Sequence, residues 1–437
     1  MIITLALAGL QMGLSRKWAF LPLLIAACHT PYTPFLGGLT AARVVILIGL
    51  ARAGSKGWLQ WNVRDSLDLL LGVFLAVTLL STFGHSWRYS NPVTERLRLV
   101  LDVGGTYLYA RAYLAEEGVF ERLAVGLALI MLPFALFMLV ERHAGVNPYY
   151  LIGADNKFSL IRDGKIRAQG PFGTPILAGT VGASAIPLLL PLWKTRRTIA
   201  RWGLVACLLV IYSTASSGPI ATALLGIGGV MFWPWRRHLK ALIVTTVILL
   251  IIADIIKTRP IWYLMALMDF VGGSTGWHRA YLIDMAIKHL NQWWLVGCDY
   301  TRDWMPYGLA SVPNHCDLTN YYIQLGVTGG LPLMLCLILI LKRAFRSIST
   351  AFDDMRGENS PREFRIWCLG VALFAHAVTF LSISYFDQMY VFFWILIGGL
   401  QGLLNEALDE SAEDEEEPVE PGQYPWAPTW SSEIPPR

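Results

Sequence analysis

Uncharged hydrophobic runs separated by short polar segments dominate the chain. No charged residue occurs in 123–140, 241–253 or 325–341. A helix rises 1.5 Å per residue, so about 20 apolar residues cross the ~30 Å hydrocarbon core of a bilayer. The pattern predicts an all-α polytopic membrane protein with about 12–13 transmembrane helices. The predicted segments are 2–14, 17–28, 36–51, 66–83, 97–114, 119–140, 173–192, 202–216, 219–233, 240–256, 319–341, 366–383 and 387–405.

The fifth of these segments, 97–114, is amphipathic. It contains Arg98, Asp102 and Arg111. Charged side chains at membrane depth face the interior of a bundle or water, because their exposure to lipid is costly. We therefore expect this helix to face protein or water.

Basic residues gather in segments that this set of helices places on one side. Cytoplasmic segments carry an excess of Lys and Arg, so this side is assigned to the cytoplasm. The clusters are Arg16 and Lys17; Arg52, Lys56 and Arg64; Lys194, Arg196, Arg197 and Arg201; Arg236, Arg237 and Lys240; and Lys342, Arg343, Arg346, Arg356, Arg362 and Arg365. The outer side then receives 141–172, the turn 216–219, 257–318 and the turn 384–387.

This topology divides the chain into four parts. Residues 1–256 form N-terminal transmembrane helices with the outer loop 141–172, and residues 257–318 form a large outer loop that is partly helical. Residues 319–405 form the C-terminal transmembrane helices. Residues 406–437 are rich in Pro, Glu and Ser, which predicts a disordered acidic tail in the cytoplasm.

Composition narrows the class of function. The chain is 55% hydrophobic and 15% charged, with a net charge of +4. Its basic residues sit at helix ends rather than in a stripe, so we do not expect nucleic-acid binding. Cys298 and Cys316 share the large outer loop and could form a disulfide there, with two free thiols as the alternative.

Basic residues on the outer side mark a first candidate site. Arg162, Lys165 and Arg167 precede a Gly- and Pro-rich stretch, 170–175, that ends just before a helix. Positive-inside statistics disfavour these cations on the outer side. They either meet lipid headgroups or form an anion site at the membrane surface.

A second candidate lies in the large outer loop. Ser274 or Thr275 is a plausible helix N-cap, which would put His278 and Arg279 in the first helical turn. A helix N-terminus favours an anion, and arginine adds planar donors that match phosphate oxygens. The alternative is a solvated loop helix.

The third candidate is His315, which precedes the eleventh hydrophobic segment. Asn314 or Asp317 could cap that helix, and the positive end of the helix dipole would then oppose protonation of His315. A neutral imidazole can accept a proton; the alternative is a histidine that satisfies a buried carbonyl. Within the helix, Gly326 and Gly330 are four residues apart and allow close contact.

Taken together, these segments resemble the O-antigen ligase-related membrane family, which includes O-antigen ligases, O-antigen polymerases and some protein O-oligosaccharyltransferases. The late His motif of the family is similar to 315–331, and an earlier Arg motif is similar to 167–175. Between them, Arg279 starts a helix that leads to 294–297, where the family has Pro-Leu-x-Gly. The likeness covers roughly 120–400.

Several positions depart from the family pattern. Cys316 and Ile176 stand where the family has Asn, and Gln324 stands where it has an acidic residue. The turn 213–218 lacks the arginine of the usual Ser-x-Ser-Arg element. These departures leave the subfamily open.

The resemblance implies a GT-C-like fold in the bacterial inner membrane, with the site facing the periplasm. It implies inverting transfer of a glycan from undecaprenyl diphosphate to an acceptor glycan, lipid A–core or other hydroxyl, without metal or cofactor. Arg167 and Arg279 would hold the diphosphate, and His315 would orient or deprotonate the acceptor. Further substrate contacts would come from Arg162, His278, Asn314 and Tyr322.

The residues support this chemistry independently. A departing diphosphate develops negative charge, which fixed cations stabilise. No Asp-x-Asp, the usual metal-holding element of many glycosyltransferases, occurs in the chain. Arginine would then replace the metal.

Two other classes of function stay open. A polysaccharide-precursor transporter or lipid-carrier flippase would place charges near the bilayer midplane, and Asp102 and Arg111 favour that reading. A non-catalytic scaffold would use the acidic tail to recruit cytoplasmic partners. The outer position of the candidate residues favours the glycosyltransferase.

Overall fold

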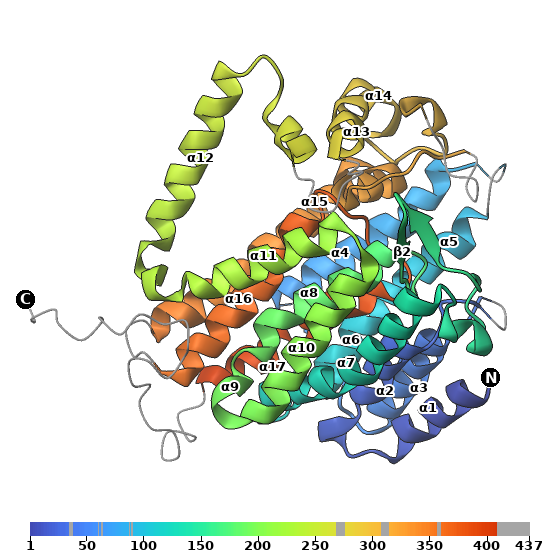
Figure 1. Cartoon of the computed structure of the whole chain (residues 1–437), viewed down its shortest axis with the longest axis vertical. Coiled ribbons are helices and arrows are strands. Elements are labelled where there is room, and N and C mark those ends of the chain that lie inside the picture. The colour runs from blue at the N-terminus through green and yellow to red at the C-terminus, as the bar shows by residue number, and fades with distance from the viewer. Residues whose placement is uncertain are drawn as a thin grey trace, which may run out of the picture.

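The computed structural model describes residues 1–34, 38–59, 61–62, 64–86, 88, 91–267, 276–306, 314–355 and 360–408. Each of the thirteen predicted hydrophobic segments coincides with a helix of this part of the chain. Most of these helices pack side by side in one bundle, while α12 stands apart (Figure 1). The prediction of an all-α architecture is confirmed.

Helices account for nearly all of the described secondary structure. The first half contains α1 (Ile2–Gly13), α2 (Leu21–His29), α3 (Ala41–Ser55), α4 (Ser66–Leu80), α5 (Pro92–Val100), α6 (Thr106–Tyr113), α7 (Val119–Ala144), α8 (Pro175–Leu189), α9 (Leu192–Thr195), α10 (Arg197–Thr214) and α11 (Ser217–Met231). The second half contains α12 (Leu239–Ile256), α13 (Gly276–Lys288), α14 (Leu290–Trp293), α15 (Tyr321–Asp354), α16 (Pro361–Thr379) and α17 (Met389–Leu408).

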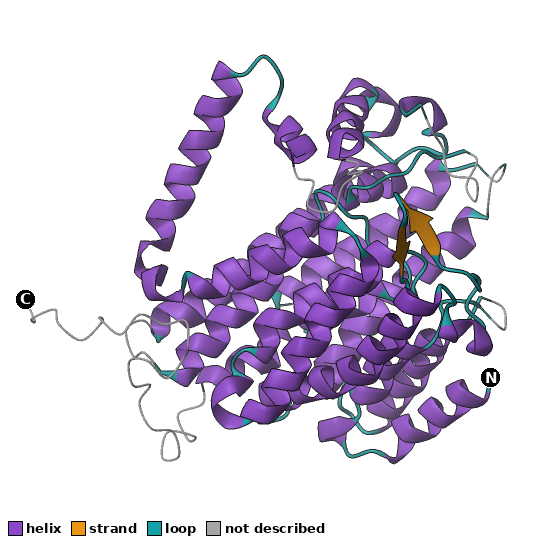
Figure 2. Cartoon of the chain, viewed as in Figure 1, coloured by secondary structure: helices purple, strands orange, loops and turns teal. Residues whose placement is uncertain are grey.

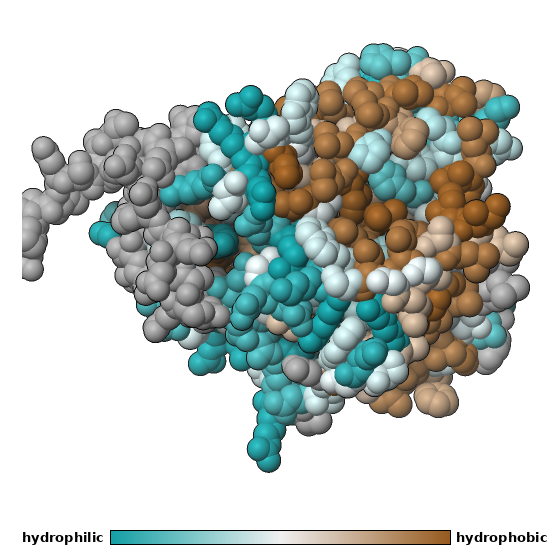
Figure 3. All heavy atoms as spheres, turned by 90° about the horizontal axis from the view of Figure 1, so that it is seen from below, coloured by the Kyte–Doolittle hydropathy of each residue, from teal (hydrophilic) through white to brown (hydrophobic). Residues whose placement is uncertain are grey.

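Within the described residues, five helical segments are long and apolar enough to cross a membrane. They are Ser66–Gly84, Val119–Ala144, Trp233–Ile256, Tyr321–Asp354 and Met389–Glu406. A view from below shows a broad hydrophobic area beside a hydrophilic one (Figure 3). This separation is typical of a surface that is covered partly by lipid and partly by water. The chain is therefore a multi-pass membrane protein.

Polar contacts distinguish two ends of the bundle. At one end, Arg236 pairs with Glu363 and Arg196 pairs with Glu121, which joins segments of the predicted cytoplasmic side. At the other end, Arg279 contacts the turn between α16 and α17. We call this second end, which carries 145–174, 276–306 and 314–320, the loop end.

The amphipathic fifth segment faces protein, as predicted. It forms α5, a π-helical turn η3 (Leu101–Gly105) and α6. Asp102 accepts bonds of 2.8 and 2.6 Å from Arg43 of α3, and Arg111 donates to Asp68 of α4 at 2.9 Å. Asp102 and Arg111 are therefore neutralised by neighbouring helices, whereas Arg98 pairs with Glu95 of its own helix at 3.2 Å.

Helix α15 is broken near its start, and the break anchors the loop end. Gly329 and Gly330 have non-helical backbone angles, and Pro332 follows. The freed backbone groups bind the segment after α14: Cys298 N–H donates to Val327 O at 2.9 Å, and Leu331 N–H donates to Trp294 O at 2.8 Å.

Two glycines make this docking possible. Gly297 and Gly330 both have positive φ angles. A Cβ atom would lie 2.1 Å from Val327 O at Gly297 and 2.2 Å from Leu295 O at Gly330. The close helix contact predicted for Gly326 and Gly330 is found at Gly326, which packs against Trp293 of α14, whereas Gly330 meets Leu295 in the segment after that helix.

The described strands form a single hairpin, which the sequence did not predict. Strands β1 (Leu160–Arg162) and β2 (Lys165–Arg167) are antiparallel (Figure 2). Asp163 and Gly164 form the two-residue turn, with φ angles of 50° and 71°. Positive φ at both central positions suits the right-handed twist of a tight hairpin, which explains the Asp-Gly pair.

The remaining predictions on local structure have mixed outcomes. Asn320, not Asn314 or Asp317, caps α15: its side chain accepts from Ile323 N–H at 3.0 Å. The sequence prediction was wrong because the extended stretch before α15 continues to Asn320. The expected caps Ser274 and Thr275, and the acidic tail from 409 onward, lie outside the described residues.

Candidate functional site

Three arginines from two distant segments approach one another at the loop end. Arg162 and Arg167 lie on the hairpin, and Arg279 lies in the first turn of α13, as predicted. The positive charge of Arg279 lowers the pKa of Arg167, and the positive charge of Arg162 lowers the pKa of both other arginines. Arg167 and Arg279 are more than a hundred residues apart in sequence, so only the tertiary fold brings them together. We call these three residues the arginine cluster.

Two interhelical turns hold the cluster in place. Arg167 donates to Thr214 O at 3.3 Å and to Ser216 Oγ at 2.5 Å, in the turn between α10 and α11. Arg279 donates from Nε to Ser382 O at 2.8 Å, in the turn between α16 and α17. The two turns touch: a Cβ atom at Gly218 would lie 2.9 Å from the side chain of Ile383.

The partners of Arg167 and Arg279 are neutral. Within the described residues, their hydrogen bonds go to a hydroxyl and to backbone carbonyls, and neither arginine forms an ion pair. Asp163 raises the pKa of Arg167 and Asp317 raises that of Arg279, in both cases through space and not through a hydrogen bond. Arg279 is 7% exposed, so its charge is buried without an ion-pair partner among the residues that the structure describes.

The electrostatics of the cluster follow from this arrangement. Burial, and then the charges of Arg162 and Arg279, lower the pKa of Arg167. Burial also lowers the pKa of Arg279, although Asp317 opposes that shift. An arginine does not lose its proton in proteins, so the shifts mean that the positive charge is energetically unfavourable. An anion bound here would relieve that cost.

His315 belongs to a second group of polar residues at the loop end. Its Nδ1 is 3.0 Å from Thr301 Oγ1. Asp299, two residues before Thr301, accepts from His85 Nδ1 at 2.6 Å and from Ser86 N–H at 2.7 Å. The charges of Asp299, His85 and Arg96 all act on His315. We call this set the histidine group.

The histidine group is tied to the break in α15. Thr328 O, just before the break, accepts from Arg96 Nη2 at 2.7 Å and lies 3.1 Å from His85 Nε2. Arg96 lies on α5, and His85 follows η2 (Ser81–Gly84) at the end of α4. The histidine group therefore joins the segment 294–301 to the bundle.

The pKa of His315 is lowered, which confirms the predicted direction. Burial is the main cause, and the positive charges of His85 and Arg96 add to it against the opposing effect of Asp299. These causes explain the lowered pKa of His315 without the dipole of α15, which the sequence suggested as the cause. A histidine whose pKa lies below 6.5 is mostly neutral at neutral pH, and its ring can accept a proton.

The other predicted site residues divide between the two groups. His278 Nε2 lies 3.0 Å from Asp317 O, beside the arginine cluster. Asn314 donates to Asp299 O at 2.6 Å, within the histidine group. Tyr322 belongs to neither, because its hydroxyl donates to Ala377 O on α16 at 2.9 Å. The described contacts therefore give Tyr322 a packing role between helices.

The two groups are joined by a short stretch of backbone. Asp317, whose charge acts on Arg279, is two residues from His315. No direct contact links His315 to the arginines among the described side chains. A substrate that touches both groups would have to span the space between them.

Sequence reasoning missed three charged residues at the loop end. His85 and Asp299 lie in different polar segments, and nothing in their spacing predicts their contact. Asp387, in the turn before α17, has a φ angle of 53° and packs against Gly173. Burial and the nearby Asp102 raise the pKa of Asp387 to about 7.

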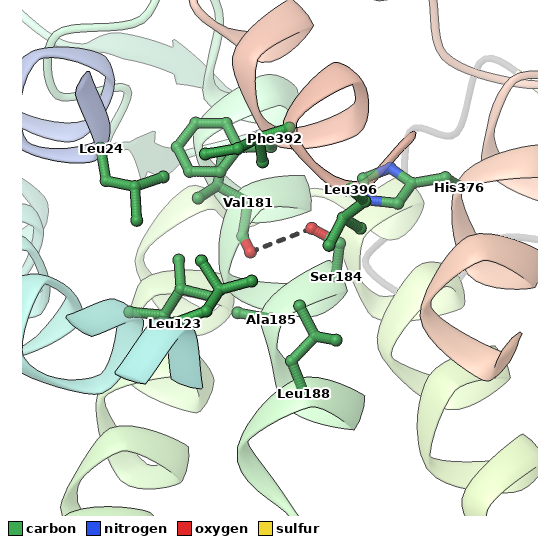
Figure 4. Close-up of a pocket in the computed structure, with 11 residues that line it drawn as sticks. Leu24, Leu123, Val181, Ser184, Ala185, Leu188, His376, Phe392 and Leu396 are labelled. Atoms are coloured by element: carbon green, nitrogen blue, oxygen red, sulfur yellow. Dashed lines mark hydrogen bonds between the residues drawn. The ribbon is translucent and has the colours of Figure 1, made fainter. Parts of the chain in front are cut away.

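A cavity within the bundle is distinct from both groups. It encloses about 20 Å³, and apolar side chains together with His376 and Ser184 line it (Figure 4). Ser184 donates to Val181 O, and His376 Nδ1 is bonded to the Tyr385 hydroxyl at 2.7 Å. A space of this size holds about one water molecule, so it does not accommodate a glycan or a lipid.

Comparisons with known proteins identify no family. No protein-family model matches the chain, and no curated protein matches it. Among the described residues, no group of three or more His, Cys, Asp or Glu side chains could hold a metal ion. The function must therefore be argued from the geometry of the loop end.

Proposed function

We propose that the protein is an inner-membrane glycosyltransferase that transfers a glycan from undecaprenyl diphosphate to an acceptor hydroxyl at the periplasmic face. The observation that carries this proposal is the positive charge of the half-buried Arg167 and the buried Arg279, which have only neutral hydrogen-bond partners in the described chain. A diphosphate supplies the missing negative charge. The motif resemblance at 167–175, 279 and 315–331 points to the same chemistry.

In the proposed reaction, the acceptor oxygen attacks the anomeric carbon while the bond from that carbon to the diphosphate oxygen breaks. The electron pair of the broken bond stays on the diphosphate, where Arg167 and Arg279 stabilise it. Attack from the face opposite the leaving group inverts the anomeric configuration. The glycan is thus transferred without a covalent intermediate on the protein.

His315 receives the proton of the acceptor hydroxyl. When Nδ1 carries the hydrogen that bonds to Thr301 Oγ1, Nε2 presents its lone pair to the acceptor. The lowered pKa keeps this nitrogen free of a proton at neutral pH. A positioned base commonly contributes 10²–10⁴-fold, roughly, to the rate.

Replacement of the two central residues tests the proposal. Arg279→Lys removes the planar fork of donors, and His315→Ala removes the base. Each should lower glycan transfer by about 10²–10³-fold, as removal of one preorganised donor commonly does. Surface glycan resolved on gels from strains that express each variant at equal membrane levels measures the effect.

Matched controls come from the opposite end of the bundle. Arg196→Lys and His238→Ala change exposed residues there and should leave transfer unchanged. Undecaprenyl diphosphate should raise the Tm of the purified wild type but not that of Arg279→Lys. Full-length transfer by both site variants would refute the assigned roles.

The transport alternative loses its main support. Asp102 and Arg111, the charges that favoured it, are paired with Arg43 and Asp68 inside the bundle. A transporter uses such charges to bind cargo near the bilayer midplane. Charges that are neutralised by neighbouring helices give no evidence of a cargo site.

A further inference from the structure

Two cysteines of the loop end lie on neighbouring backbone segments. Cys298 precedes Asp299, and Cys316 directly follows His315. Thr301 N–H donates to Asn314 O at 3.0 Å, and the Asn314 side chain donates to Asp299 O at 2.6 Å. These bonds hold the segment around Cys298 beside the segment around Cys316.

The two thiols share one environment. Cys316 is buried, and its Sγ lies 3.7 Å from Thr301 Oγ1. Cys298 packs against the same apolar cluster that contains Cys316, together with Trp293 and Val327. The charge that Cys316 carries when ionised acts on Cys298. Both thiols are reduced in the structure.

We propose that Cys298 and Cys316 form an intramolecular disulfide that fastens the segment of His315 to the segment of Asp299. The inference rests on the proposed function to the extent that it needs the loop end to face an oxidising compartment. Its consequence for that function is a fixed position for His315. The other cysteines, Cys28, Cys207, Cys336 and Cys368, lie in helices of the bundle.

The redox step is a thiol–disulfide exchange. Two Sγ–H bonds break and one Sγ–Sγ bond forms, while the two protons pass, directly or through water, to the two sulfurs of the oxidant whose S–S bond breaks. The two electrons pass to an oxidant of the dithiol–disulfide class, whose disulfide becomes a dithiol. The reaction therefore needs no metal.

The burial of the thiols determines when this bond can form. Burial raises the pKa of Cys298 to about 11 and also raises that of Cys316. The thiolate is the reactive form, so the folded, reduced chain reacts slowly. We therefore expect the disulfide to form while the loop folds, and to reform slowly after reduction.

Thiol counting tests the proposal on the full chain. Membranes are quenched in acid, denatured and blocked with N-ethylmaleimide, and then reduced and labelled with a maleimide-linked polyethylene glycol. The wild type should gain two labels after reduction, whereas Cys298→Ser and Cys316→Ser should gain none. A wild type without new labels, or a gain that persists in either variant, would overturn the proposal.

Limited proteolysis tests the fastening of the His315 segment. Trypsin cleavage after Arg302 should become about tenfold faster or more when the wild type is reduced, because the loop opens more often. In Cys298→Ser, the reductant should have no effect. An equal cleavage rate for the oxidised and reduced wild type would refute the fastening role.

The two readouts are independent of glycan transfer. If Arg279→Lys and His315→Ala keep full transfer while two thiols are still oxidised, the proposed function fails and the disulfide stands. If transfer is lost in those variants but the thiols are reduced, the disulfide alone fails.

Discussion

Buried and half-buried arginines occur in two settings in this protein, and their partners differ. In the bundle, Arg43 is bound by both carboxylate oxygens of Asp102, and Arg111 is bound by Asp68. At the loop end, the hydrogen bonds that Arg167 and Arg279 form within the described part of the chain go to carbonyls and a hydroxyl. Within the described residues, Arg43 and Arg111 are thus neutralised by carboxylates, whereas Arg167 and Arg279 form no ion pair.

This difference in partners distinguishes arginines that stabilise the fold from arginines that can bind an anion. An arginine paired with a carboxylate contributes to the fold, because removal of one partner leaves the other buried and uncompensated. An arginine that is repelled by its neighbours adds no such stability, and its charge remains available to an anion. Burial alone therefore does not identify a binding residue; the nature of its partners does.

The most direct test of this comparison is to replace one arginine from each setting. Arg43→Met leaves Asp102 buried without its partner and should lower the free energy of unfolding by about 3–5 kcal/mol. Arg279→Met relieves repulsion and should not lower it. Unfolding in mixed detergent micelles measures both. A similar loss in the two variants would contradict the distinction.

The break in α15 allows a second test, because it positions the histidine group. Gly330→Ala places a Cβ atom against Leu295 O and needs a left-handed backbone, so it should cost about 3 kcal/mol. Gly228→Ala on α11 is the matched control, since a Cβ atom there meets no atom within 4 Å. The control should stabilise slightly, by up to about 1 kcal/mol. If Gly330→Ala and Gly228→Ala changed the Tm equally, the docking of the segment around Leu295 against the break in α15 would be refuted.

Asp387 extends the comparison to a buried carboxylate. Its negative charge is mostly not neutralised by nearby positive charges. Its pKa is raised to about 7, so the folded chain keeps a proton that the unfolded chain has already lost above pH 4, roughly. Stability should therefore fall as the pH rises from about 4 to about 7, by roughly 2 kcal/mol. The difference in Tm between wild type and Asp387→Asn, measured from pH 5 to pH 8, isolates this contribution.

The control for that experiment is Asp303→Asn, which changes an exposed carboxylate of the same loop end. It should keep the pH dependence of the wild type. If Asp387→Asn shows the same pH dependence as the wild type, the carboxyl group of Asp387 is not held protonated by its surroundings.

Local sequence patterns determined the helices of this protein. Uncharged runs of sufficient length have few alternatives to a helix in lipid, because each backbone group must be satisfied within the segment. The Asp163–Gly164 turn and the α15 break likewise follow from local chemistry, although the sequence was not read that way. The candidate residues Arg167, Arg279 and His315 were also found from their unusual positions beside helix ends.

Only the tertiary structure decided which of these residues meet. It brought Arg162, Arg167 and Arg279 together, and it placed His315 with His85 and Asp299 instead. It also set the pairing of Asp102 with Arg43, which turned a candidate transport residue into a structural one. Such contacts join positions far apart in the chain, and their energies depend on burial and on the partner charge. A single sequence contains neither distance nor burial, so it can nominate charged residues but cannot assign their partners.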